Sequence, residues 1–223
     1  MDLNKSYEYF QPESVRQRIH IIGCGSVGST VAENLARCGL TKFTLWDFDK
    51  VESKNIVNQM FREQDVGKPK VEALRDLILD INPEAKNDIK LKPDGWQGEL
   101  VSGYVFLAVD SVKIRREFCE KHMASPNVKA VFDFRTLLES AQHFAADWSD
   151  LRQRENLMRS MEFSDEDAED AVPVSACGTV LGVATTVRLI CALGVDNFLN
   201  FVKDKGLKKM VIIDGFNFTL TAF

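Results

Sequence analysis

Three glycines near the N-terminus have the spacing of a phosphate-binding loop. Gly23, Gly25 and Gly28 form the pattern Gly-x-Gly-x-x-Gly, which follows a short apolar run at residues 18–22. The first glycine of such a pattern allows a tight turn, the second lets the backbone approach a phosphate, and the third lets a helix pack on the strand. Free N–H groups from Ser26 onward then face the anion. The loop predicts a nucleotide site; the alternative is a turn that merely starts a sheet.

An acidic residue ends the next expected strand, at residues 43–46. Asp47 lies 24 positions after Gly23. A carboxylate at this place is suited to accept hydrogen bonds from the ribose hydroxyls of a nucleotide. Both NAD and ATP fit these two features, so residues further along the chain must separate them.

Two charged residues further along could act on a phosphate chain. Lys70 lies near the start of an amphipathic helix expected over 68–81, and Asp110 follows a buried strand expected over 104–109. Lysine supplies a mobile positive charge, and a carboxylate binds Mg²⁺ through its oxygens. The structural alternatives are a solvated lysine at a helix start and an aspartate that caps the next helix.

The alternation of apolar strands and amphipathic helices predicts a Rossmann-like α/β fold with a doubly wound, mostly parallel sheet. We expect the C-terminal part to be more antiparallel, with its last two strands joined by a turn at Asp214-Gly215. The further expected elements are helices at 26–38, 112–123 and 180–193 and strands at 128–132, 140–148, 210–213 and 216–220.

Composition indicates one domain over residues 1–223, with a polar lead-in at 1–15. A charged segment at 150–175 is expected to be a mobile crossover loop or an exposed helix. The net charge of −5 argues against a nucleic-acid partner. No apolar run approaches the roughly 20 residues of a membrane span, and the polar N-terminus lacks a signal-peptide layout. We therefore expect a cytosolic protein with no membrane partner.

Cysteines and histidines do not predict a metal centre. The chain has five cysteines, no Cys-x-x-Cys pair and three histidines, so no zinc site is expected. Cys177 precedes an expected helix, where the thiol pKa would be lowered; this residue is either a nucleophilic thiol or a small packing residue. Cys24, Cys38, Cys119 and Cys191 are expected to fill the core, and His20 is expected to be a hydrogen-bonded core residue.

The motifs from Gly23 to about residue 125 resemble the ThiF/MoeB/ubiquitin-activating superfamily. The chain carries, in the family's order, GCGSVGSTVAENLARCGL, DFDKVESKN, NQ, VGKPKVEAL and VFLAVDS. Enzymes of this superfamily use ATP and Mg²⁺ to adenylate a C-terminal carboxylate. The resemblance implies the same reaction here, on a small ubiquitin-like or sulfur-carrier-like protein or a peptide. Together with the small residues of 180–193, it also implies a homodimer.

The resemblance assigns roles to individual residues. Asp47 would hold the ribose, and Asp49 would lie near the phosphates or support the loop. Lys70 would contact the phosphates, and Asp110 would ligate Mg²⁺. The nucleotide-binding residues implied in this way are Gly23, Gly25, Ser26, Gly28, Asp47, Asp49, Asn55, Asn58, Gln59, Lys70, Asp110 and Ser111.

One position departs from the family pattern. Asn58 stands where the family usually has an arginine before Gln59. Arginine forks onto phosphate oxygens, whereas asparagine offers two neutral donors. Arg62 or Arg115 could supply the missing charge, as could Arg16 or Arg18 from a neighbouring subunit.

Two further functions stay open at this point. The first is a nucleotide-binding pseudoenzyme that docks a partner without adenylating it. The second is an NAD-binding oxidoreductase, which would need a catalytic proton donor and a substrate lobe that the sequence does not reveal.

Overall fold

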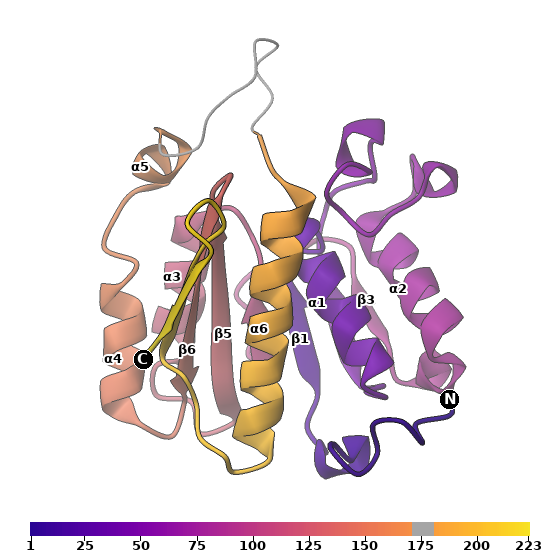
Figure 1. Cartoon of the computed structure of the whole chain (residues 1–223), viewed down its shortest axis with the longest axis horizontal. Helices are drawn as coiled ribbons and strands as arrows, with labels where there is room; N and C mark the ends of the chain where they lie inside the picture. The colour runs from indigo at the N-terminus through magenta and orange to yellow at the C-terminus, as the bar shows by residue number, and fades with distance from the viewer. Residues whose placement is uncertain (171–180) are drawn as a thin grey trace.

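A central eight-stranded sheet organises the part of the chain that this computed structural model describes, residues 1–170 and 181–223 (Figure 1). The strands lie in the order β3-β2-β1-β4-β5-β6-β7-β8. The strands are β1 (Ile19–Ile22), β2 (Phe43–Trp46), β3 (Lys90–Lys92), β4 (Gly103–Leu107), β5 (Val128–Thr136), β6 (Ser140–Asp147), β7 (Met210–Asp214) and β8 (Thr219–Ala222).

The helices connect these strands and cover both faces of the sheet. The α-helices are α1 (Ser26–Arg37), α2 (Lys70–Ile81), α3 (Val112–His122), α4 (Leu151–Arg159), α5 (Asp165–Asp170) and α6 (Ala184–Val202). Short 3-10 turns are η1 (Pro12–Ser14), η2 (Ser53–Asn55), η3 (Glu63–Asp65) and η4 (Pro83–Asn87).

Strand direction confirms the predicted fold class. Strands β1 to β5 pair in parallel, whereas β6, β7 and β8 add in antiparallel fashion. Strand β3 was not predicted, because its three residues Lys-Leu-Lys lie at the sheet edge and carry no apolar run. The result is an α/β sheet with an antiparallel C-terminal part, as the sequence indicated.

The two faces of the sheet bury separate apolar layers. Along β4, Tyr104 and Phe106 join the layer under α1, α2 and α6, whereas Val105 and Leu107 join the layer under α3 and α4. This alternation follows from the two-residue period of a strand. Figure 1 shows α6, α1 and α2 side by side over the first face.

Strand order creates a crevice at the carboxyl edge of the sheet. Strand β1 lies between β2 and β4. The chain therefore adds β2 and β3 on one side of β1 and then β4 and β5 on the other side. Ligands of open α/β sheets bind where the strand order reverses in this way. Gly23 follows β1 and Asp110 follows β4 by three residues, so the fold places both at this crevice.

The second half differs from expectation in its boundaries. Of the two alternatives for 150–175, the described part is helical: α4 buries Leu157, and α5 follows it. Strand β8 begins at Thr219 rather than at residue 216, because the Asp214 carboxylate accepts the N–H groups of Phe216 and Asn217 and widens the turn.

Helix α6 corrects one expectation about apolar runs. It has 19 residues and a mean hydropathy of 1.2, so by length and composition alone it is long and apolar enough to cross a membrane. Half of it is buried. The Cys191 Sγ lies 3.7 Å from the carbonyl oxygen of Val27 in α1. This close approach to another backbone, which the small residues of 180–193 predicted, is typical of a core helix.

Candidate functional site

The glycine loop has the backbone geometry that its spacing predicts. Gly23 adopts a φ of +90°, and a Cβ there would lie 2.6 Å from the carbonyl oxygen of Ala108. A Cβ on Gly28 would overlap the carbonyl oxygen of Gly23. A Cβ on Gly25 would meet only the Gln59 Nε2, at 4.0 Å. The first and third glycines are therefore needed for packing, and the second leaves an open approach to the backbone.

Asp47 ties the loop to the end of β2. Its Oδ2 accepts the Cys24 N–H at 2.6 Å, and its Oδ1 accepts the Asp49 N–H at 2.8 Å. Burial raises the pKa of Asp47, although these two N–H groups and the charge of Lys70 act in the opposite direction. Each oxygen keeps a second lone pair for a further donor. The ribose contact of Asp47 stays a prediction.

Lys70 is buried and paired at the start of α2. Its Nζ donates to Asp49 Oδ2 at 2.8 Å, and its side chain is 9% exposed against 50% for Asp49. The alternative of a solvated lysine is therefore wrong. Asp49 N–H in turn donates to Asp47, which accepts the Cys24 N–H, so two hydrogen-bonded carboxylates connect the ammonium to the glycine loop.

The asparagine-rich segment packs beside the loop. Met60 N–H donates to the Ser29 hydroxyl of α1 at 3.1 Å. Asn55 Oδ1 accepts the Glu52 N–H at 2.8 Å and caps η2, a local structural contact. Gln59 Oε1 is buried without a hydrogen-bond partner in the described chain. Its amide also faces Gly25, so Gln59 is the residue of this segment best placed to meet a ligand.

Asn58 lies against the chain that leads into α6. A Cβ on Gly182 would lie 2.5 Å from the Asn58 Nδ2. The position of the family's arginine is therefore packed against Gly182, two residues before α6 begins.

Asp110 is exposed at the carboxyl edge of β4, and the cap of α3 is its neighbour Ser111. The Ser111 Oγ accepts the Ile114 N–H at 3.2 Å. The alternative that Asp110 caps this helix is therefore wrong. The Ser111 hydroxyl also donates to the carboxylate of Asp165 at 3.1 Å. Asp165 is not among the residues that the sequence predicted for the site.

Neither candidate replacement arginine reaches the glycine loop in this chain. Arg115 is buried and donates to Asp133 and to the carbonyl oxygens of Val109 and Phe134. Arg62 pairs with Asp80 at 3.7 Å in the last turn of α2, ten residues or about 15 Å along the helix from Lys70.

The two N-terminal arginines lie away from this chain's crevice. Arg18 donates to the carbonyl oxygens of Phe43 and Asp88 at 2.6 and 2.7 Å. Phe43 begins β2, so Arg18 lies at the amino edge of the sheet, opposite the crevice. Arg16 is exposed.

The donor set fits Mg²⁺ in the company of phosphate oxygens. Within residues 1–170 and 181–223, no group of three or more His, Cys, Asp or Glu side chains could hold a metal ion. Protein sites for Mg²⁺ commonly use one or two carboxylates together with waters and substrate phosphates. The exposed carboxylate of Asp110 at the mouth of the crevice suits that arrangement.

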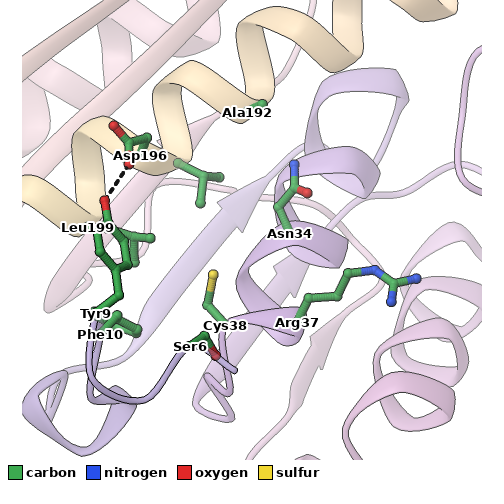
Figure 2. A pocket seen from close by; sticks show the side chains of 10 residues that line it. Ser6, Tyr9, Phe10, Asn34, Arg37, Cys38, Ala192, Asp196 and Leu199 are labelled. Atoms are coloured by element: carbon green, nitrogen blue, oxygen red, sulfur yellow. Dashed lines mark hydrogen bonds between the residues drawn. The ribbon is translucent and has the colours of Figure 1, made fainter. Parts of the chain in front are cut away.

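The apolar hollow drawn in Figure 2 is distinct from this site. It has a volume of about 280 Å³ between the N-terminal segment, the end of α1 and α6. Tyr9 hydroxyl donates there to Asp196 at 2.9 Å, and the half-buried Cys38 lines it. Because Cys38 follows α1 whereas the glycine loop precedes it, the length of that helix, about 18 Å, separates the two.

The other cysteines and His20 are buried. Cys24, Cys119 and Cys191 lie in the core, where burial raises the pKa of each thiol. His20 hydrogen-bonds with Ser102 and Trp46, as expected of a core residue. Cys177 lies outside the described residues.

Comparisons with known proteins identify the family of this chain. The family model described as "ThiF family" matches residues 4–222. Ubiquitin-like modifier-activating enzyme 5 of Caenorhabditis briggsae is 37% identical over 89 residues, which are 40% of this chain and 20% of that protein. The Caenorhabditis elegans enzyme is 40% identical over 78 residues, 34% of this chain and 19% of that protein. The match thus spans about a fifth of these relatives.

Solved structures share the fold over most of the chain. The structure of PaaA covers 100% of this chain and 68% of its own length, with a TM-score of 0.71 and 16% identity. E. coli MccB with ATP covers 95% of this chain and 65% of its own length, with a TM-score of 0.69 and 16% identity. Since the family model spans nearly every residue, the chain belongs to the ThiF family.

Proposed function

We propose that this chain binds ATP with Mg²⁺ and transfers AMP to the C-terminal carboxylate of a small protein or peptide. The observation that carries the proposal is the gathering of the glycine loop, Asp47 and the buried Lys70 at the sheet's crevice. Related proteins support it: the curated relatives are named ubiquitin-like modifier-activating enzymes, and E. coli MccB has been solved with ATP and with MccA.

The proposed reaction joins two anions. An oxygen of the substrate carboxylate attacks the α-phosphorus of ATP and forms a new O–P bond. The bond from that phosphorus to the oxygen bridging to the β-phosphate breaks, and pyrophosphate leaves with the electron pair. Fixed positive charge lowers the barrier of such a step.

The chain's own groups supply binding and charge. Backbone N–H groups at the start of α1 would receive phosphate beside Gly25, whose surroundings are open. Lys70 would place its ammonium on phosphate oxygens while Asp49 holds it in position. Mg²⁺ held by Asp110 and phosphate oxygens would neutralise part of the triphosphate charge.

Calorimetric titration with ATP, with and without Mg²⁺, tests the binding half of this proposal. We expect Mg·ATP to bind and NAD not to compete. Binding of NAD in preference to ATP would contradict the proposal and favour the oxidoreductase. Exchange of labelled pyrophosphate into ATP, assayed with a panel of peptides bearing free C-termini, then tests the transfer half.

A pseudoenzyme is the second candidate, and the surroundings of Asn58 favour it. Asn58 replaces the family's arginine, and Arg62 and Arg115 are both held away from the loop. Such a protein would bind ATP yet support no exchange with any carrier. Substituting Asn58→Arg should then raise exchange from the background, whereas an active wild-type protein would exclude this candidate.

A homodimer is part of the proposal and has its own test. Phe216 and Phe218 lie in the turn between β7 and β8, and Phe223 follows β8; they are 73%, 94% and 65% exposed. Exposed apolar patches mark interaction surfaces. Sedimentation equilibrium should show twice the chain mass, and a monomer at micromolar concentration would exclude both the dimer and a contribution of Arg16 from a partner subunit.

A further inference from the structure

The carboxylate of Asp165 lies on the first turn of α3, although it belongs to another helix. It accepts the N–H groups of Val112 and, at 3.3 Å, of Lys113. It also accepts the Ser111 hydroxyl at 3.1 Å, from 54 residues away in the chain. The first N–H groups of a helix lack partners within the helix, so this carboxylate satisfies two of them.

Ser111 forms hydrogen bonds both to Asp165 and to the first turn of α3. Its Oγ accepts the Ile114 N–H at 3.2 Å while its hydroxyl hydrogen goes to Asp165. A negative charge at a helix N-terminus is stabilised by the helix dipole. Asp165 and Ser111 therefore hold the first turn of α3 as one hydrogen-bonded unit.

The chain on the other side of Asp110 is held as firmly. The Arg115 guanidinium donates to the carbonyl oxygen of Val109 at 2.9 Å, and the same group is anchored on the buried Asp133. Asp110 is therefore flanked by a carbonyl fixed from inside the protein and by a turn fixed by Asp165. The Asp110 side chain itself is exposed, and the backbone on both sides of it is held by these two contacts.

We infer that Asp165 is a positioning residue for Asp110. It acts through Ser111 and the first turn of α3, and it sets the direction from which the Asp110 carboxylate meets Mg²⁺. The inference rests on the proposed function, because it takes Asp110 as the metal ligand. It also couples metal binding to the acidic helix α5, a link that sequence reasoning did not find.

A Mg²⁺ titration of ATP binding tests this inference. Asp165→Ala should raise the Mg²⁺ concentration needed for half-maximal ATP binding about tenfold, the lower end of the cost of removing a group that orients a metal ligand. ATP affinity measured in EDTA should not change. Asp165→Asn keeps a carbonyl acceptor for the Val112 and Lys113 N–H groups, so it should restore most of the Mg²⁺ response.

Glu166→Ala is the matched control. Its carboxylate is exposed next to Asp165 and makes no hydrogen bond or ion pair with the rest of the described chain. This variant should titrate like the wild type. Circular dichroism melting checks that each variant folds, and Ser111→Ala, which removes one link only, replaces Asp165→Ala if that protein does not fold.

Three outcomes would overturn the inference. One is an unchanged Mg²⁺ response of Asp165→Ala, and another is an equal loss of ATP affinity with and without Mg²⁺. The third is an Asp165→Asn protein as impaired as Asp165→Ala, since a direct metal ligand would behave in that way. A wild-type protein that binds no ATP refutes the proposed function itself, which distinguishes the two failures.

Discussion

Lys70 Nζ donates to Asp49 Oδ2 at 2.8 Å, and this pair joins the start of α2 to the segment that follows β2. Asp49 N–H in turn donates to Asp47, whose other oxygen accepts the Cys24 N–H. One short hydrogen-bonded chain thus connects three segments that meet at the crevice. Arrival of a triphosphate would bring anionic oxygens to an ammonium that is already held in place.

Substitution of Lys70 should therefore impair the proposed transfer of AMP. We expect Lys70→Ala to lower pyrophosphate exchange by about 10²-fold, the typical cost of removing one group that stabilises charge in the transition state. Lys68→Ala is the matched control, because Lys68 lies two residues before Lys70 and pairs with Asp65 instead of Asp49. Equal activity of Lys70→Ala and Lys68→Ala would remove Lys70 from the site.

Alanine at Gly25 should affect ATP binding, whereas alanine at Gly28 should affect folding. Gly28→Ala should impair folding, because its Cβ would overlap the Gly23 carbonyl oxygen, whereas Gly25→Ala has room. Gly25→Ala should keep the wild-type melting temperature and lose ATP affinity, because its methyl group would occupy the approach to the backbone. Differential scanning calorimetry and ATP titration measure the two effects. A Gly25→Ala protein with wild-type affinity would place the phosphates elsewhere.

Arg115 and Arg62 should differ in their effect on stability. Arg115→Ala leaves the fully buried Asp133 with Arg135 as its remaining ion-pair partner in the described chain, so we expect a loss of about 3 kcal/mol in the free energy of unfolding. Arg62→Ala removes an exposed ion pair with Asp80 and should change the free energy of unfolding by about 0.5 kcal/mol or less. Urea unfolding gives both values.

The same Arg62→Ala protein tests whether Arg62 replaces the family's arginine. Because Arg62 lies at the far end of α2 from Lys70, we expect unchanged ATP affinity and unchanged exchange. A large loss of exchange at constant stability would instead assign Arg62 to the phosphate site.

Acid should destabilise the fold through buried histidines. Burial lowers the pKa of His143 to about 4, and its ring lies between the carbonyl of Asp133 and the amide of Asn197. Between pH 6.5 and 4 the unfolded chain binds the proton more readily, so stability is lost as pH falls. For one such histidine the loss from pH 7 to pH 5 is about 2 kcal/mol.

Urea unfolding at pH 7 and pH 5 measures this loss. Burial also lowers the pKa of His20 to about 4, so His20 adds to the loss of stability as pH falls. His143→Gln should reduce the loss of stability between pH 7 and pH 5 by the contribution of this one histidine. It should also lower the free energy of unfolding at pH 7. A slope that His143→Gln leaves unchanged would show that His143 does not titrate in this range.

Local patterns in the sequence determined the sheet and the loop. The glycine spacing, the apolar strand before it and Asp47 after the next strand are features of short segments, so they predicted a parallel sheet with a loop at its edge. Since the carboxyl ends of parallel strands meet at one edge, the order of motifs also brought Gly23 and Asp110 to the same crevice. The burial of Lys70 was beyond this reasoning, because it depends on Asp49 being folded against it.

Only the tertiary structure decided the directions of long side chains and the contacts between distant helices. Arg115 points inward because the buried Asp133 attracts it, and Arg62 points along α2 because Asp80 lies there. Asp165 meets the first turn of α3 from 54 residues away, which no periodicity encodes. A spacing rule describes residues within one element, whereas these contacts arise from how separate elements pack. The sequence thus predicted the glycine loop, and the packing determined which charged side chains lie beside it.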